Sequence, residues 1–181
     1  MTSQSPKPTI VLVHGAFEDG SIWKEVIQRL QRDGYHVIVF GNPLRGVSVD
    51  TAYLRSVLDR IDGPVILVAH SYGGAVITQA DKFHSQVAAD VSKSEADMLL
   101  ATQRQMDKLC LTEAPTVAAW TNKPTWQIMT TKDLAIPLAE QKFEAARAKS
   151  HSIEIDASHA VTVSNPGTVA DVIEQAIRAT T

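Results

Sequence analysis

The sequence predicts an α/β fold with a mostly parallel central sheet that is flanked by helices on both faces. Short runs rich in β-branched residues alternate along the chain with amphipathic stretches, which is typical of parallel strands connected by helices. The run at residues 9–13 is almost continuously apolar, as expected for a strand buried on both faces. The chain has 181 residues, 44% of them hydrophobic and 20% charged, which suffices for one globular domain with a single core.

Five short apolar runs are the candidate strands. They occupy residues 9–13, 36–40, 65–69, 126–130 and 152–155. Their length and their content of β-branched residues favour strands over buried helices. The third strand runs directly into Ser71.

Helix signals follow each of the first three strands. Ser21 can cap a helix for which Gly34 is a suitable stop. The second helix opens at Ser48 or Asp50. A further helix begins at residues 73–77, directly after the third strand.

The second half of the chain has three more helix signals. Ser92 and Glu95 form a capping box, which predicts a helix over residues 92–109. Residues 137–148 form a helix with a proline in its first turn, and the Asn-Pro pair at 165–166 begins the last helix.

Ser71 lies in the most informative motif of the chain, Ala69-His70-Ser71-Tyr72-Gly73-Gly74. Small residues two positions before and after the serine permit a tight strand-to-helix turn, which exposes the hydroxyl at the carboxyl edge of the sheet. The N-terminus of the following helix lies beneath that hydroxyl and favours negative charge there. The motif predicts a nucleophilic serine, with an ordinary glycine-rich turn as the alternative.

A second motif, His14-Gly15-Ala16-Phe17, closes the first strand. Acyl transfer requires two donors directed at the oxygen that becomes negative in the intermediate. We predict that the backbone N–H groups of Ala16 and Tyr72 form this oxyanion hole. His14 itself is interpreted as a structural turn residue.

A nucleophilic serine requires a general base, and His159 is the candidate. It follows the last strand and precedes the last helix, so its loop can reach the carboxyl edge of the sheet. His70 is expected to point away from Ser71. The other histidines are expected in structural or surface positions (His14, His36, His84 and His151).

Asp133 is the candidate for the acid that orients the histidine. It follows the fourth strand and precedes the proline-started helix, and the order Ser71, Asp133, His159 is a known order of such triads. Alone, this aspartate would be interpreted as a turn or helix-cap residue. Asp156 is the rival acid, but it lies only three residues from His159.

Four motifs together resemble those of cofactor-independent α/β-hydrolases of the esterase and methylesterase group, which also contains hydroxynitrile lyases. They are His14-Gly15-Ala16-Phe17, the Ser71 turn, residues 131–137 (TKDLAIP) and residues 158–166 (SHAVTVSNP). The resemblance covers residues 8–81 and 124–178. It implies hydrolysis of carboxylic esters through an acyl-enzyme by a serine, a histidine and an aspartate, with no cofactor and no metal.

The chain departs from that family in its middle. Family members have another strand and cap elements after the nucleophile helix, whereas nothing in residues 82–112 is typical of a buried strand. We expect one domain, residues 1–181, that lacks one strand and has residues 82–123 as a reduced helical cap-like segment. Closing the gap would move the predicted acid and base by about 4.8 Å towards Ser71. An open gap would expose a sheet edge through which a homodimer can form.

Phe17, Trp23 and Trp120 are the candidate residues for an apolar substrate pocket. A reduced cap would leave the site open and favour small esters. Perhydrolysis, C–C bond hydrolysis and cyanohydrin cleavage are alternative chemistries for the same triad. A non-catalytic binding protein on the same scaffold is the alternative of a different class.

Composition limits the partners. The net charge of −3 and the absence of a Lys/Arg-rich stripe argue against nucleic acid and against an anionic membrane surface. The apolar runs are too short to span a membrane, and the first residues lack the pattern of a secretory signal. Cys110 is the only cysteine, which excludes an intramolecular disulfide. We expect a cytoplasmic, metal-independent protein with a small-molecule ester as its partner.

Overall fold

The computed structural model describes residues 7–71, 87–104, 107, 109–113 and 119–180. The strands are β1 (Thr9–Val13), β2 (His36–Phe40), β3 (Val65–Ala69), β4 (Trp126–Thr130) and β5 (His151–Ile155). Four have the predicted bounds, and the fifth begins one residue earlier than predicted. The helix predicted at residues 73–77 lies outside the described residues.

The strands form two parallel sheets, one with the order β2-β1-β3 and the other with β4 beside β5. Val13 pairs with Phe40 on one side and with Ala69 on the other, so the three strands of the first sheet end at one edge. Thr130 pairs with Ile155 at the corresponding end of the second sheet. The α/β class is confirmed, and among the described residues the expected central sheet is present as two separate parts.

The division lies between β3 and β4. One edge of β3 pairs with β1, and the other pairs with no strand in the part of the chain that the structure describes. Leu67 of β3 is 50% exposed, whereas Ile10 and Leu12 of β1 are fully buried. In the described residues, strand pairing therefore does not close the gap between β3 and β4. Only such closure would move Asp133 towards Ser71, so that predicted shift is not expected.

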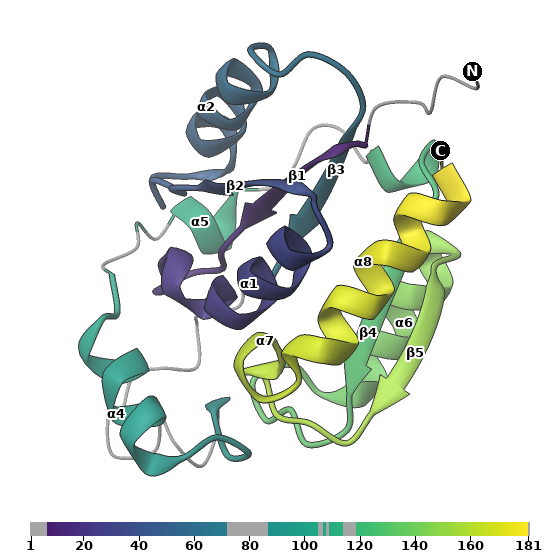
Figure 1. The fold of residues 1–181 in the computed structure, drawn as a ribbon. Helices are drawn as coiled ribbons and strands as arrows, with labels where there is room; N and C mark the ends of the chain where they lie inside the picture. The colour runs from purple at the N-terminus through teal and green to yellow at the C-terminus, as the bar shows by residue number, and fades with distance from the viewer. Residues whose placement is uncertain (1–6, 72–86, 105–106, 108, 114–118, 181) are drawn as a thin grey trace.

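α8 (Pro166–Thr180) connects the two sheets by packing against both β3 and β4. Figure 1 shows this helix in yellow, in front of the strands and beside α1 (Lys24–Arg32), with which it also packs. The core cluster contains or contacts side chains from all of these elements (Ile10, Leu12, Val26, Leu30, Ile66, Ile128, Val169, Ile173 and Ile177). Among the described residues, side-chain packing rather than strand pairing connects the two sheets.

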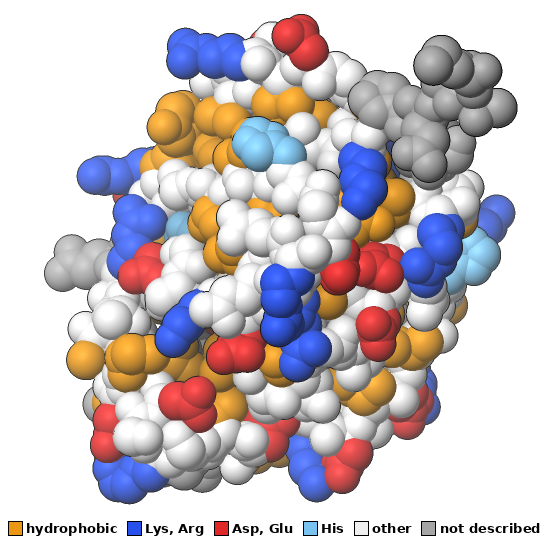
Figure 2. Space-filling view, viewed as in Figure 1, with side chains coloured by type: hydrophobic (Ala, Val, Ile, Leu, Met, Phe, Trp, Pro, Cys, Tyr) orange, Lys and Arg blue, Asp and Glu red, His pale blue; other side chains and the backbone are white. Residues whose placement is uncertain are grey.

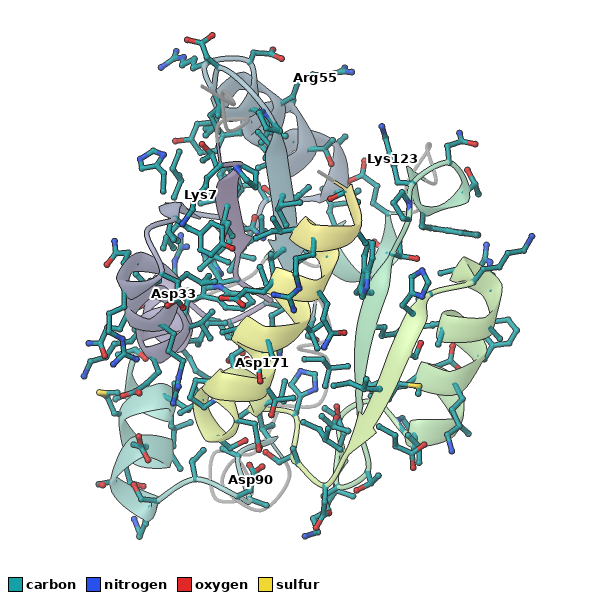
Figure 3. The ribbon with its side chains drawn as sticks, turned by 45° about the vertical axis from the view of Figure 1, so that its right-hand side comes forward. Lys7, Asp33, Arg55, Asp90, Lys123 and Asp171 are labelled. Carbon is teal, nitrogen blue, oxygen red and sulfur yellow. The ribbon has the colours of Figure 1, made fainter. Side chains whose placement is uncertain are left out.

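Helices flank the sheets on both faces, as predicted. In Figure 1, α1 and α2 (Val47–Leu58) lie on opposite sides of β2. Figure 3 shows α8 on one side of β4 and β5 and α6 (Leu138–Ala148) on the other. The short elements are η1 (Gly20–Trp23), α5 (Leu109–Thr112), η4 (Ala119–Thr121) and α7 (Val161–Ser164).

Several helix boundaries differ from the prediction. α2 begins at Val47, with Gly46 as its N-cap residue, and so before both predicted starts. Asp19, rather than Ser21, caps the first helical turn, because its carboxylate accepts the N–H of Ser21 at 2.8 Å. The predicted capping box of Ser92 and Glu95 is present at the start of α4 (Lys93–Ala101). The helix does not extend to residue 109 as predicted. It ends at Ala101, and the hydroxyl of the next residue, Thr102, donates to the carbonyl of Met98 at 3.0 Å.

The surface carries mixed charge on the face shown in Figure 2, where Lys and Arg side chains alternate with Asp and Glu. None of the helices among the described residues has the length and apolarity that a membrane-spanning helix requires.

Candidate active site

The loop after β1 and the turn after β3 meet at the carboxyl edge of the first sheet. Val13 pairs with Ala69, and the N–H of His70 donates to the carbonyl of Val13 at 3.0 Å. Gly15 then passes so close to the turn that a Cβ atom there would lie 2.0 Å from the carbonyl oxygen of Ser71. Only glycine fits this approach, which places the predicted oxyanion loop against the predicted nucleophile.

Asp133 and His159 form a buried pair at the carboxyl edge of the second sheet. Nδ1 of His159 lies 2.8 Å from Oδ2 of Asp133, and each residue is 8% exposed. The other carboxylate oxygen accepts the N–H groups of Ala135 and Ile136, each at 2.8 Å. Oδ2 also accepts the hydroxyl of Thr130 at 3.3 Å. These bonds hold the carboxylate in one orientation towards the imidazole.

Asp133 is held in its ionised form by its neighbours. Burial raises the pKa of this carboxyl, but the hydrogen bond and charge of His159 and the two backbone N–H groups outweigh burial, so the pKa is lowered from its ordinary value. A carboxylate only accepts hydrogen bonds, so Nδ1 of His159 carries a proton. In the neutral imidazole, Nε2 then presents a lone pair, which is the tautomer that a general base requires.

Ser71 and His159 line the same pocket. Its walls come from the loop after β1, from α4 and from the loop that carries His159, and several are apolar (Ala16, Phe17, Ile22, Val87, Leu99 and Val163). Phe17 has a φ of 63°, a strained conformation for a residue with a side chain. Ser71, His159 and an apolar wall are therefore brought together in one pocket.

Two of the predicted pocket residues lie elsewhere. Trp23 is 1% exposed and belongs to the hydrophobic core, because the apolar stripe of its helix faces inward. Trp120 lines a different pocket together with Lys123, and its ring lies 5.0 Å from the guanidinium carbon of Arg147. Figure 3 shows Lys123 at the end of the molecule opposite to Asp90, at the start of β4 rather than at its carboxyl end.

The remaining predicted residues are placed as follows. Ala16 lines the pocket, whereas Tyr72 lies outside the described residues. The rival acid Asp156 pairs instead with Lys132, at 2.7 Å.

His14 has a structural setting, in agreement with its interpretation as a turn residue. It is 1% exposed, and its Nε2 accepts the N–H of Asn42 at 3.0 Å. Burial lowers the pKa of this imidazole from its ordinary value, as expected for a ring that accepts a backbone hydrogen bond in its neutral form.

Asp90 is a contributor to the site that the sequence analysis missed. Its carboxylate accepts the N–H of Ser158 at 2.9 Å and also the hydroxyl of Ser158. That hydroxyl lies 3.0 Å from the carbonyl oxygen of Val87, which in turn accepts the N–H of Ala160 at 2.9 Å. Residues 87–90 therefore brace the residues on both sides of His159.

Glu18 and His70 form a second carboxylate–histidine pair that was also missed. Glu18 lines the pocket, and its Oε2 lies 3.0 Å from Nδ1 of His70. The imidazole rings of His70 and His159 are 5.0 Å apart. His70 contacts Glu18 through Nδ1 and the carbonyl oxygen of His159 through Nε2, and no short motif marked Glu18 in the sequence. In the part of the chain that the structure describes, no three His, Cys, Asp or Glu side chains are grouped as a metal site.

Comparison with known proteins assigns the family. A sequence model of the alpha/beta hydrolase family matches residues 10–102, which is more than half of the chain. The chain belongs to the alpha/beta hydrolase family. The resemblance inferred from the four motifs is thereby confirmed. No curated protein matches this hydrolase-family chain in sequence.

Solved structures similar to this hydrolase-family chain share its fold along nearly its whole length. Polyneuridine aldehyde esterase has a TM-score of 0.81 at 15% identity, with 94% of this chain and 99% of that chain covered. A methylesterase from Arabidopsis has a TM-score of 0.80 at 14% identity, with 95% and 99% covered. A pyrethroid hydrolase from Sphingobium faniae has a TM-score of 0.71 at 16% identity, with 96% and 98% covered. Both sheets therefore superpose at once on structures of this fold.

Proposed function

We propose that this protein is a serine hydrolase that cleaves small carboxylic esters through an acyl-enzyme. The observation that carries the proposal is the 2.8 Å contact between Asp133 and Nδ1 of His159, in a pocket that His159 shares with Ser71. A carboxylate-oriented imidazole next to a serine is the arrangement that activates a hydroxyl as a nucleophile. Structural neighbours that are named as esterases support the same reaction class.

The first half of the proposed reaction forms the acyl-enzyme. Oγ of Ser71 forms a bond to the ester carbonyl carbon while Nε2 of His159 takes the hydroxyl proton, and Asp133 stabilises the resulting imidazolium. The N–H groups of Ala16 and Tyr72 bind the oxygen that becomes negative. His159 then gives its proton to the alcohol oxygen as the C–O bond breaks and the alcohol leaves.

The second half returns the enzyme to its starting state. Water forms a bond to the acyl carbon while His159 takes one of its protons. The bond between the carbon and Oγ of Ser71 breaks, and the serine oxygen recovers a proton from His159. The carboxylic acid product leaves. The cycle consumes one water and needs no other reactant.

The pocket walls support a small, apolar acyl group. Phe17, Ile22 and Leu99 line the space around the serine, and Thr102 and Gln103, directly after α4, complete this wall. We expect p-nitrophenyl acetate and butyrate to be cleaved faster than long-chain p-nitrophenyl esters. A clear preference for long chains would contradict this proposal.

The test is hydrolysis of p-nitrophenyl acetate by the wild type beside Ser71→Ala and His159→Ala. Both variants should lose at least about 10³-fold in kcat while remaining folded, because serine and base act as a unit. Ser56→Ala is the matched control, since that serine lies on the exposed surface of α2 and bonds only to a local carbonyl in the structure described. A fluorophosphonate should label the wild type and the control but not Ser71→Ala.

A second candidate is a binding protein without turnover, and the division of the sheet between β3 and β4 favours it. Equal, near-background rates in the wild type and all variants, without fluorophosphonate labelling, would support that alternative. Other chemistries of the same residues are a third outcome, and one structural neighbour is a tomato methylketone synthase. For these other chemistries, fluorophosphonate would still label Ser71, but p-nitrophenyl acetate would not be cleaved.

Three further predictions accompany this proposal. We propose that residues 1–181 form one domain in which residues 82–123 are a reduced cap, and the contribution of α4 to the pocket supports that assignment. A homodimer through the β3 edge remains a prediction, which sedimentation equilibrium tests directly. A cytoplasmic location, like the lack of nucleic-acid and membrane partners, is likewise proposed from the sequence.

A further inference from the structure

His70 faces a hydrogen-bond acceptor at each of its ring nitrogens. Nδ1 lies 3.0 Å from Oε2 of Glu18, and Nε2 lies 3.0 Å from the carbonyl oxygen of His159. Ionised carboxylates and carbonyls only accept, so both contacts are hydrogen bonds only if both ring nitrogens carry protons. The geometry is therefore that of an imidazolium beside a carboxylate.

The partners of Glu18 favour its ionised form. The same Oε2 accepts the N–H of Gly15 at 2.9 Å, so it already serves as an acceptor for a second donor. Burial raises the pKa of this carboxyl, but the charge and hydrogen bond of His70 outweigh burial and lower it from its ordinary value. The side chain of Glu18 is 21% exposed and that of His70 is 9% exposed, so water screens the pair only partly.

His70 is surrounded by groups that favour its protonation. Burial lowers the pKa of the imidazole, but Glu18, the carbonyl of His159 and the more distant charge of Asp133 outweigh burial and raise it from its ordinary value. The ring of His159 lies 5.0 Å away, and the ring of Trp23 meets His70 edge-on at 6.3 Å. These are the charged, titratable and aromatic groups that face His70 in the described structure.

The pair connects two loops that must keep a fixed relation if the proposed reaction occurs. At one end, Glu18 holds the N–H of Gly15, the residue before the predicted oxyanion donor Ala16. At the other end, His70 holds the backbone of His159, the predicted base. No strand pairing in the described residues joins the sheets that carry these loops, so side-chain links of this kind carry more of the positioning.

We propose that Glu18 and His70 form a positioning pair, in which a carboxylate and a doubly protonated imidazole tie the oxyanion loop after β1 to the loop that carries His159. Neither residue exchanges a proton with the substrate. The pair holds the base at a fixed distance from the nucleophile turn, because His70 is the residue directly before Ser71 in that turn. The positioning role rests on the proposed hydrolase function, whereas the protonation state of His70 does not.

NMR of protein labelled with ¹⁵N-histidine tests the pair itself. We expect one imidazole that keeps protons on both nitrogens above the ordinary histidine pKa of about 6.5. Its signals should be missing in His70→Gln. In Glu18→Gln, the same ring should carry a single proton at neutral pH, because an amide N–H in the place of Oε2 can donate to Nδ1 while Nε2–H still donates to the carbonyl of His159. A His70 that is singly protonated at neutral pH in the wild type would overturn the inference.

Kinetics of two Glu18 variants test the positioning role. Glu18→Ala removes both bonds of the carboxylate, and we expect kcat for p-nitrophenyl acetate to fall by about 10- to 100-fold with little change in KM, since small displacements of catalytic groups are costly. Glu18→Gln preserves side-chain size and can keep both hydrogen bonds of a neutral His70, although it gives up the bond to Gly15, so it should recover most of the lost kcat. Rates are expressed per serine titrated with fluorophosphonate, which removes the contribution of unfolded protein.

The outcomes separate this inference from the proposed function. A wild type that neither cleaves the ester nor reacts with fluorophosphonate would contradict the hydrolase proposal, while the NMR result would still decide the protonation of His70. An active enzyme in which Glu18→Ala, once folded, matches the wild type in kcat would overturn the positioning role. If Glu18→Ala does not fold, Glu18→Gln is compared with the wild type instead. The pair would be overturned if the two proteins had the same kcat and the same protonation of His70.

Discussion

The two sheets hold complementary halves of the candidate site in different ways. The β2-β1-β3 sheet positions Ser71 through backbone contacts, namely strand pairing up to Ala69 and the close approach of Gly15. The β4-β5 sheet positions Asp133 and His159 through side-chain hydrogen bonds within its loops. The first half depends on the path of the chain, and the second depends on individual side chains. The relation between the halves depends on α8 and on links between loops.

The largest effect should come from the side-chain half. Asp133→Asn preserves the size of the residue but removes the carboxylate that keeps the proton on Nδ1 of His159, so kcat should fall by about 10⁴-fold. Asp156→Asn is the matched control, because Asp156 lies close in sequence but pairs with Lys132 on the surface. Steady-state kinetics on p-nitrophenyl acetate measure both. If only Asp156→Asn lost activity, the acid that orients His159 would be Asp156 and the assignment to Asp133 would be wrong.

Removing packing between the halves should have the next largest effect. Ile173 belongs to α8, and its side chain is 5% exposed in the core. Ile173→Ala truncates this side chain, and we expect it to lower the free energy of unfolding by about 2–5 kcal/mol. Val49→Ala is the control, because Val49 is 53% exposed and its truncation should change little. Urea denaturation measures both variants. A loss below about 1 kcal/mol for Ile173→Ala would show that α8 does not bind the sheets together.

The smallest effect should come from the brace around His159. Burial raises the pKa of Asp90, but the hydrogen bonds from Ser158 outweigh burial and lower it from its ordinary value. A lowered pKa in the folded state contributes stability above the ordinary value of 3.8, and this contribution is lost as the pH falls through the folded-state pKa. Because Asp90 is exposed, Asp90→Asn should cost only about 1 kcal/mol or less at neutral pH.

Urea denaturation of wild type and Asp90→Asn at neutral and strongly acidic pH measures this difference. The two proteins should differ at neutral pH and converge when Asp90 of the wild type is protonated. A difference that persists unchanged in acid would mean that the carboxylate charge is not what braces the loop.

Local patterns in the sequence were sufficient to predict the five described strands. They also predicted the helix starts at Ser92 and at residues 165–166. Each of these depends on residues close together in the chain. The pairing of Asp133 with His159 was also predicted, because the order of the motifs constrains which loops share a sheet edge. Glu18 was missed because its partner His70 lies 52 residues away, and a lone glutamate in a polar loop resembles any surface residue.

The division of the sheet was the least predictable feature. The sequence analysis found no strand in residues 82–112, which left open whether the remaining strands would close the gap. In the described residues the sheets do not pair, and the apolar stripe of α8 packs against both β3 and β4. That outcome depends on the packing of one helix against elements far away in the sequence, which no local pattern records. Trp23 and Trp120 were misplaced for a related reason, since aromatic character alone does not distinguish the core from a pocket.

The absence of strand pairing between β3 and β4 in the described structure has a practical consequence for engineering. A cut in the chain between α4 and β4 would separate a fragment with Ser71 from a fragment with Asp133 and His159 without breaking a strand pair of either sheet. Each fragment alone would hold an incomplete set of reactive groups. Fused to two interacting proteins, the fragments would report association as turnover by the proposed hydrolase, with α8 as the surface that reunites them.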